Sequence, residues 1–164
     1  MEFASIKEKF LVPGAVGITL LLWAYKRRGL AFLVAVAVMV GFNDFFSHHI
    51  LKETIARERP CHVLENITRV MNCSNSFSFP SNHASNIFTF ATLLTLCFRK
   101  LIFIALPLAL VVGYSRVYLG VHYPFDVLGG AVLGIGMGVL GFQLYRRILK
   151  FMERWPLFKN ESAE

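Results

Sequence analysis

The sequence predicts an all-α integral membrane protein, a polytopic bundle of about five transmembrane helices forming a single domain over residues 1–164. Hydrophobic residues make up 55% of the chain, charged residues only 16%, and the mean hydropathy is +0.56. These values lie outside the usual range of soluble proteins. The formal net charge of +7 does not indicate nucleic-acid binding, because the basic residues cluster at the ends of apolar runs, where membrane topology places them.

Five apolar stretches are the candidate membrane crossings. They lie at 10–25, 30–50, 84–98, 101–119 and 123–145. A full crossing takes about 20 residues, so the first and third stretches are expected to borrow flanking residues or to tilt little. A cleaved signal peptide is the alternative for the first stretch. It is disfavoured because acidic residues balance the nearby lysines and no small-residue cleavage site follows.

Basic residues in the connections predict the orientation, because lysine and arginine collect on the cytoplasmic side. If the odd-numbered connections face the cytoplasm, most of the 17 lysines and arginines lie there. The N-terminus then lies outside and the C-terminus inside. This topology places two polar connections, 51–83 and 115–126, on the same extracytoplasmic face, so their side chains can meet.

Three polar motifs lie in these connections. They are Lys52 with Arg59-Pro60, then Pro80-Ser81-Asn82-His83, and then Ser115-Arg116 with His122 and Asp126. A single basic residue beside a membrane span is ordinarily a snorkelling anchor. Together, however, the motifs supply three fixed cations, two imidazoles and a carboxylate. Such a set can bind a phosphate group, which carries close to two negative charges.

The spacing of the last motif predicts a nucleophile and its orienting acid. His122 and Asp126 are four residues apart, so they share one face at the start of a helix. The carboxylate can hold one ring N–H and leave the other ring nitrogen free to attack phosphorus. His83 follows Ser81 and Asn82 at a predicted helix start, where an anion can bind. We therefore expect His83 to protonate the departing alcohol.

These motifs resemble the three signature motifs of the type 2 phosphatidic acid phosphatase superfamily in order and internal spacing. The resemblance covers Lys52 to Asp126. It implies that His122 forms a phosphohistidine, that Asp126 orients it, and that His83 serves first as general acid and then as the base that activates water. It also implies a set of phosphate-binding residues: Lys52, Arg59, Ser81, Asn82 through its backbone N–H, and Arg116.

The sequence departs from this family in two respects. The family usually has glycine where Asn82 stands, and asparagine is among the better substitutes if the backbone there has a positive φ. The chain also looks shorter than the six-span members, as if an N-terminal helix were missing or reduced to an interfacial stretch.

The predicted function is removal of a phosphate from a lipid head group at the extracytoplasmic face. The compact size is similar to that of bacterial lipid A 1-phosphatases, so lipid A 1-phosphate is the first substrate hypothesis. Phosphatidylglycerophosphate, phosphatidic acid and undecaprenyl diphosphate stay open as substrates, as does transfer of the phosphoryl group to a lipid alcohol. The predicted location is a bacterial inner membrane with the site facing the periplasm. A monomer suffices, although a homodimer is compatible with the sequence.

Three other classes of protein are alternatives to a phosphatase. A metal hydrolase is disfavoured because three cations around one site would repel a divalent ion, so no metal and no cofactor are expected. A vanadate-dependent haloperoxidase uses the same constellation in relatives but is expected to be soluble. A non-catalytic transporter or assembly subunit predicts that His122→Ala leaves function intact.

Some further features point to packing or to undecided roles. Cys61 and Cys73 lie in one connection and could pair in an oxidising compartment. Asp44 is either a partner of the basic cluster or an interfacial acid that reaches water. The stripe of Gly130, Gly134 and Gly138 predicts a close helix contact within the monomer.

Overall fold

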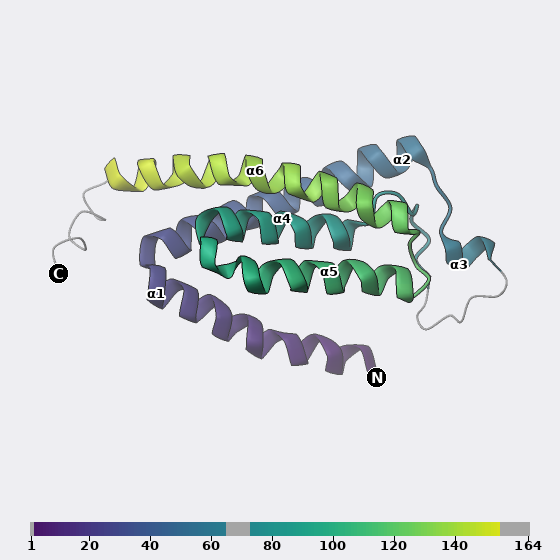
Figure 1. The fold of residues 1–164 in the computed structure, drawn as a ribbon, viewed down its shortest axis with the longest axis horizontal. Coiled ribbons are helices and arrows are strands. Elements are labelled where there is room, and N and C mark those ends of the chain that lie inside the picture. Colours follow the sequence, from purple (N-terminus) through teal and green to yellow (C-terminus); the bar gives the residue numbers. More distant parts are fainter. Residues whose placement is uncertain (1, 65–72, 155–164) are drawn as a thin grey trace. The chain divides into compact units, whose positions relative to one another are not determined.

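The computed structural model describes residues 2–64 and 73–154, and this part of the chain is helical without strands (Figure 1). The elements are α1 Glu2–Phe46, a π-helix at Ser47–Leu51, α2 Lys52–Ile55, α3 Pro60–Val63, α4 Asn82–Cys97, a 3₁₀ turn at Arg99–Leu101, α5 Ile102–Tyr118 and α6 Pro124–Arg154. Their contacts form two compact units, residues 35–144 and residues 1–34 together with 145–164. The predicted all-α fold is confirmed.

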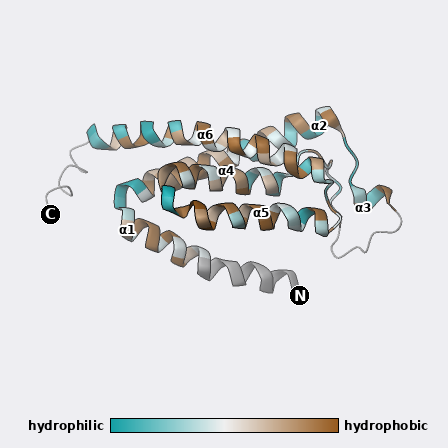
Figure 2. Cartoon of the chain, in the orientation of Figure 1, coloured by the Kyte–Doolittle hydropathy of each residue, from teal (hydrophilic) through white to brown (hydrophobic). Residues whose placement is uncertain are grey.

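In the described part of the chain, three helical segments are long and apolar enough to cross a membrane. They are Gly14–Ile55, Arg99–Tyr118 and Pro124–Arg154. Much of α5 is strongly apolar (Figure 2), and large side chains such as Phe103 and Val111 are exposed on it, as lipid contact requires. α4 has 16 residues, which is short for a crossing, as its sequence indicated. The count of five spans and their orientation stay predictions.

In the unit formed by residues 1–34 and 145–164, α1 bends sharply where the sequence predicts the first connection (Figure 1). Lys26 has a non-helical backbone, with φ 43° and ψ −115°. Across the bend, Gly29 lies close to the backbone of Leu21. A Cβ at Gly29 would stand 2.8 Å from the carbonyl oxygen of Leu21. Within this unit, the predicted stretch 10–25 and the start of the stretch 30–50 are therefore the two arms of one broken helix.

In the unit of residues 35–144, glycines bring α6 against α4. A Cβ on Gly130 would stand 2.6 Å from the carbonyl oxygen of Ser81, and one on Gly138 would stand 2.5 Å from Thr92 Cβ. A Cβ on Gly134 would stand 2.8 Å from Phe88 Cβ. Real Cβ atoms essentially never come within 3.0 Å of such neighbours, so only glycine permits this separation. The predicted close helix contact within the monomer is confirmed.

A buried polar network joins the end of α1 to the start of α4. Asn43, Ser47 and Ser85 are all 0% exposed. Ser85 Oγ donates to Asn43 Oδ1 at 2.8 Å, Asn43 Nδ2 donates to Asn86 Oδ1, and Ser47 Oγ donates to Asn82 Oδ1 at 3.0 Å. Polar groups in an apolar surrounding must find partners of their own. The network therefore fixes the start of α4 beside α1.

Candidate active site

The three predicted motifs meet around one cavity of about 270 Å³. The cavity is lined by His48, Lys52, Arg59, Ser74, Ser76, Asn82, His83, Arg116, Val121 and His122. Of the predicted site residues, only Ser81 and Asp126 do not line the cavity. Both are 0% exposed and adjoin residues that line it. The structure thus brings the whole predicted set together within residues 35–144.

Two left-handed backbone positions turn the chain toward this cavity. Ala56 ends α2 with φ 47°, after which Arg59 precedes Pro60 at the start of α3. Gly120 has φ 68°, a value that glycine adopts without steric cost. The turn at Gly120 lets the backbone N–H of His122 donate to the carbonyl of Arg116 at 3.3 Å. It thereby places His122 between α5 and α6.

The surroundings of His122 fix the tautomer of its ring. Arg59 Nη1 lies 3.3 Å from Nε2 of His122, and a guanidinium can only donate a hydrogen bond. Nε2 is therefore the unprotonated nitrogen, and the ring proton sits on Nδ1. Burial lowers the pKa of His122 from its usual 6.5, with Arg59 and Lys52 lowering it further while Asp126 opposes them. The ring is thus neutral at pH 7, with an unprotonated Nε2 that accepts the hydrogen bond of Arg59.

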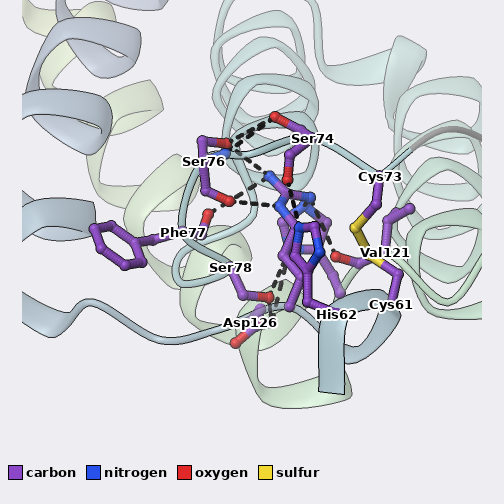
Figure 3. Close-up of a disulfide and its surroundings, with 11 residues drawn as sticks. Cys61, His62, Cys73, Ser74, Ser76, Phe77, Ser78, Val121 and Asp126 are labelled. Carbon is purple, nitrogen blue, oxygen red and sulfur yellow. Dashed lines mark hydrogen bonds and ion pairs between the residues drawn. A yellow bond between two sulfur atoms is a disulfide. The ribbon is translucent and has the colours of Figure 1, made fainter. Parts of the chain in front are cut away.

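Asp126 lies at the Nδ1 side of the ring, as its position four residues later predicts. The distance from Nδ1 to Asp126 Oδ2 is 3.7 Å, which is longer than a direct hydrogen bond. Ser78 Oγ lies 3.4 Å from Nδ1 and donates to the same carboxylate oxygen; Figure 3 shows Ser78 beside Asp126. The direct ring–carboxylate bond expected from the sequence is therefore replaced by a contact in which Ser78 takes part.

Two further donors hold the Asp126 carboxylate. The backbone N–H of Tyr123 donates to Oδ2 at 2.8 Å, and Arg57 Nη1 pairs with Oδ1 at 2.9 Å. The Arg57 guanidinium also lies 4.1 Å from the centre of the Tyr123 ring, an arrangement that favours a cation–π contact. Together with Ser78, these groups saturate the carboxylate and leave it little freedom to rotate.

Arg57 and Ser78 were not predicted as site residues. Arg57 lies two residues before Arg59, and Ser78 two residues before Pro80, so both belong to the flanks of predicted motifs. That proximity was the available signal. Each acts through Asp126, which is 69 and 48 positions away along the chain, and no local pattern encodes such a pairing.

The three cations of the cavity are held by neutral oxygen atoms. Lys52 Nζ donates to the carbonyl of Phe77, Arg59 Nε donates to the carbonyl of Ser76 at 2.7 Å, and Arg116 Nε donates to Ser115 Oγ at 3.1 Å. Lys52 and Arg59 are only 2% and 8% exposed. Among the side chains that the structure describes, at residues 14–64 and 73–154, no carboxylate lies within ion-pair distance of these three cations. Their positive charge is available to an anion in the cavity.

A disulfide joins Cys61 and Cys73, with their Cα atoms 6.2 Å apart (Figure 3). This answers the question that the sequence left open. The bond connects α3 to the segment whose Ser76 holds Arg59. Cys61, His62 and Cys73 also have potential metal-ligand atoms within 4.8 Å of one another. Because the two sulfurs are bonded to each other, they are not free thiolate ligands.

Three other predicted or debated residues lie at the start of α4. Ser81 Oγ is buried and has no hydrogen-bond partner among the described residues. Asn82 begins α4 and does not have a positive φ, so no left-handed backbone explains the departure from glycine. Asp44 accepts hydrogen bonds from Asn82 Nδ2 at 3.2 Å and from Asn86 Nδ2 at 2.9 Å. Asp44 thus bonds the amides at the start of α4, and its role toward the basic cluster stays a prediction.

The helical membrane fold and the cationic cavity with two histidines are together those of a membrane phosphatase. The model of the PAP2 superfamily matches residues 28–150. The chain belongs to the PAP2 superfamily, which confirms the resemblance carried by the three motifs.

Similar proteins include phosphatases of several lipids. The chain is 37% identical over 113 residues to a lipid A 4′-phosphatase of Bacteroides thetaiotaomicron, a match covering 64% of this chain and 50% of that protein. It is 34% identical over 154 residues to a putative undecaprenyl-diphosphatase, YbjG, of Escherichia coli, covering 87% of this chain and 75% of that one. The crystal structure of a transmembrane PAP2 type phosphatidylglycerolphosphate phosphatase from Bacillus subtilis matches with a TM-score of 0.58 and 32% identity, over 90% of this chain and 72% of that chain.

Proposed function

We propose that this chain is a metal-independent lipid phosphatase that works through a phosphohistidine at His122. The observation that carries the proposal is the neutral His122 ring, with its Nε2 lone pair beside three cations that lack acidic partners among the described residues. Fixed cations favour a bound phosphate dianion. The buried, unpartnered hydroxyl of Ser81 supplies a further donor for a phosphoryl oxygen.

In the first step, His122 Nε2 attacks the phosphorus atom and the bond from phosphorus to the alcohol oxygen breaks. Lys52, Arg59 and Arg116 hold the phosphoryl oxygens, together with the Ser81 hydroxyl and the backbone N–H of Asn82. Asp126 favours the positive charge that develops on the ring, as the acid of a catalytic triad does.

His83 gives its proton to the departing alkoxide. Burial lowers the pKa of His83 from 6.5, and Arg116, His122 and Arg59 lower it further, while Asp44 opposes them. A bound phosphate dianion adds negative charge beside the ring, which favours its protonated form. In the second step His83 takes a proton from water, the water oxygen attacks phosphorus, the P–N bond breaks and inorganic phosphate leaves.

The first test is phosphate release by the purified protein from a panel of lipid phosphates in detergent micelles containing EDTA. Lipid A 1-phosphate is the first hypothesis, with phosphatidylglycerophosphate, phosphatidic acid and undecaprenyl diphosphate as competitors. Release should persist in EDTA and disappear in His122→Ala, and the wild-type protein should carry an acid-labile phosphoryl group during turnover. Activity that survives His122→Ala would refute the proposal.

The same site could pass its phosphoryl group to a lipid alcohol. Adding an acceptor alcohol distinguishes the two outcomes, because a hydrolase produces inorganic phosphate in its presence and a phosphotransferase produces a new phosphate ester.

We also propose that the cavity faces the periplasm from a bacterial inner membrane. The bias of basic residues and the disulfide of Cys61 and Cys73, a bond typical of oxidising compartments, support this orientation. A cysteine introduced at the exposed residue Glu53 should react with a membrane-impermeant maleimide in intact spheroplasts. Labelling only after lysis would place the cavity on the cytoplasmic side.

A further inference from the structure

A second cavity, of about 510 Å³, adjoins the first one. It is lined by Asp44, Asn82, His83, Asn86, Ile87 and Val112. Asn82 and His83 line both cavities, so a molecule whose phosphate occupies the first can extend past His83 into the second. Its volume lies within the range of about 300–1,000 Å³ typical of small-molecule sites.

The polar wall of this second cavity offers both acceptors and donors. Asp44 Oδ1 accepts hydrogen bonds from the side-chain amides of Asn82 and Asn86. Its Oδ2 accepts no hydrogen bond from any residue that the structure describes. Each amide nitrogen carries two hydrogens, and one of each pair is unused in the same set of residues. Hydroxyl groups, which both donate and accept, match this wall, while Ile87 and Val112 supply an apolar side.

The two cavities differ in charge. Lys52, Arg59 and Arg116 line the first cavity. Of the lysines and arginines that the structure describes, none lines the second cavity, whereas Asp44 does. Asp44 and His83 line this cavity together, so the carboxylate places a negative charge on the side of His83 where the alcohol would depart. A leaving group with its own negative charge would be repelled there.

We propose that the second cavity binds the alcohol part of the substrate, and that Asp44, Asn82 and Asn86 select a neutral, hydroxyl-bearing alcohol such as a sugar over a leaving group that carries another phosphate. This inference rests on the proposed phosphatase function and narrows its substrate class. It predicts a higher kcat/KM for a phosphate monoester on a sugar than for a prenyl diphosphate, even though one similar protein is a putative undecaprenyl-diphosphatase.

The test compares kcat/KM for three probes with the same tail: a glucose 1-phosphate carrying one dodecyl chain, dodecyl phosphate and dodecyl diphosphate. The wild-type protein should prefer them in that order. Asp44→Asn keeps the size of the side chain and removes its charge. It should shift the ratio of sugar phosphate to diphosphate toward the diphosphate by about tenfold, the effect of one unit charge on another roughly 12 Å away at an effective dielectric constant of about 20.

Glu53→Gln is the matched control, because Glu53 is exposed and lines neither cavity. It removes the same charge and should leave the ratio unchanged. An equal ratio in Asp44→Asn and Glu53→Gln, or a wild-type preference for the diphosphate, would overturn the inference. In contrast, if the wild-type protein released phosphate from none of the three probes, or released it equally well in the His122→Ala variant, the phosphatase function itself would be refuted.

A second variant covers the case in which Asp44→Asn does not fold. Asn86→Ala keeps the carboxylate and removes one donor from the wall. Because Asn86 Oδ1 also accepts from Asn43, some loss is expected with every probe, but kcat/KM should fall further for the sugar phosphate than for the diphosphate. An equal loss for both probes would contradict a role in recognising hydroxyl groups.

Discussion

Replacing Gly134 with alanine tests the contact on which the position of α4 depends. The new Cβ would clash with the carbonyl oxygen of Ser85 and stand 2.8 Å from Phe88 Cβ and 3.0 Å from the backbone nitrogen of Thr89. Alanine in a helix gains about 1 kcal/mol over glycine, whereas overpacking costs about 1–3 kcal/mol. Because two of these neighbours are backbone atoms that cannot rotate away, the upper end applies, and we expect a net loss of about 1–2 kcal/mol.

Gly136→Ala is the control for this substitution, because nothing lies within 4 Å of a Cβ at Gly136. It should gain the helix-propensity term of about 1 kcal/mol. Thermal unfolding of both variants in the same micelles gives the comparison, with phosphate release as a second readout, since Gly134 packs on the helix that begins beside His83. A Gly134→Ala protein as stable and active as Gly136→Ala would show that α6 and α4 do not meet in this way.

Four other predictions follow from the site. For an aryl phosphate, whose leaving group needs no proton from His83, kcat/KM should fall as the pH drops through a midpoint below 6.5, because the pKa of His122 is lowered and only the neutral ring attacks; a midpoint above 6.5 would contradict this. Arg57→Gln should lower kcat about tenfold with little change in KM, from loss of one charged hydrogen bond to Asp126, and Arg57→Lys should recover part of it; a change in KM alone would refute an orienting role. His83→Ala should lose alkyl phosphate hydrolysis yet form phosphohistidine from an aryl phosphate, whose phenolate leaves without a proton; loss of phosphohistidine from both substrates would argue against general acid catalysis. Ala56→Gly should raise the free energy of unfolding by about 0.5–1 kcal/mol, because φ 47° strains alanine; thermal unfolding measures it, and a lower stability would refute the strain.

The helices could be predicted from the sequence because lipid exposure imposes long apolar runs. The bend at Lys26 coincides with a basic turn between two such runs, and α4 is short because its apolar stretch is short. The π-helix at Ser47–Leu51 could not be foreseen, since no local pattern distinguishes it from an ordinary helical turn.

The predicted site residues were found through their spacing, which reflects the chemistry that they share. The contacts of Arg57 and Ser78 with Asp126, and those of Asp44 with two amide side chains, could not be predicted, because the partners are distant in sequence. Asn82 shows the limit of a family pattern, because its departure from glycine suggested a special backbone. Its side chain instead makes hydrogen bonds to Ser47 in the π-helix and to Asp44 in α1.

The carboxylate of Asp126 is held by groups from three separate stretches of chain: Arg57 after α2, Ser78 before α4, and the backbone of Tyr123 before α6. If His122 is the nucleophile that we propose, a chain in which these three stretches have not yet packed together lacks the carboxylate that orients its ring. We therefore expect phosphate release to appear only after all three stretches have assembled around Asp126.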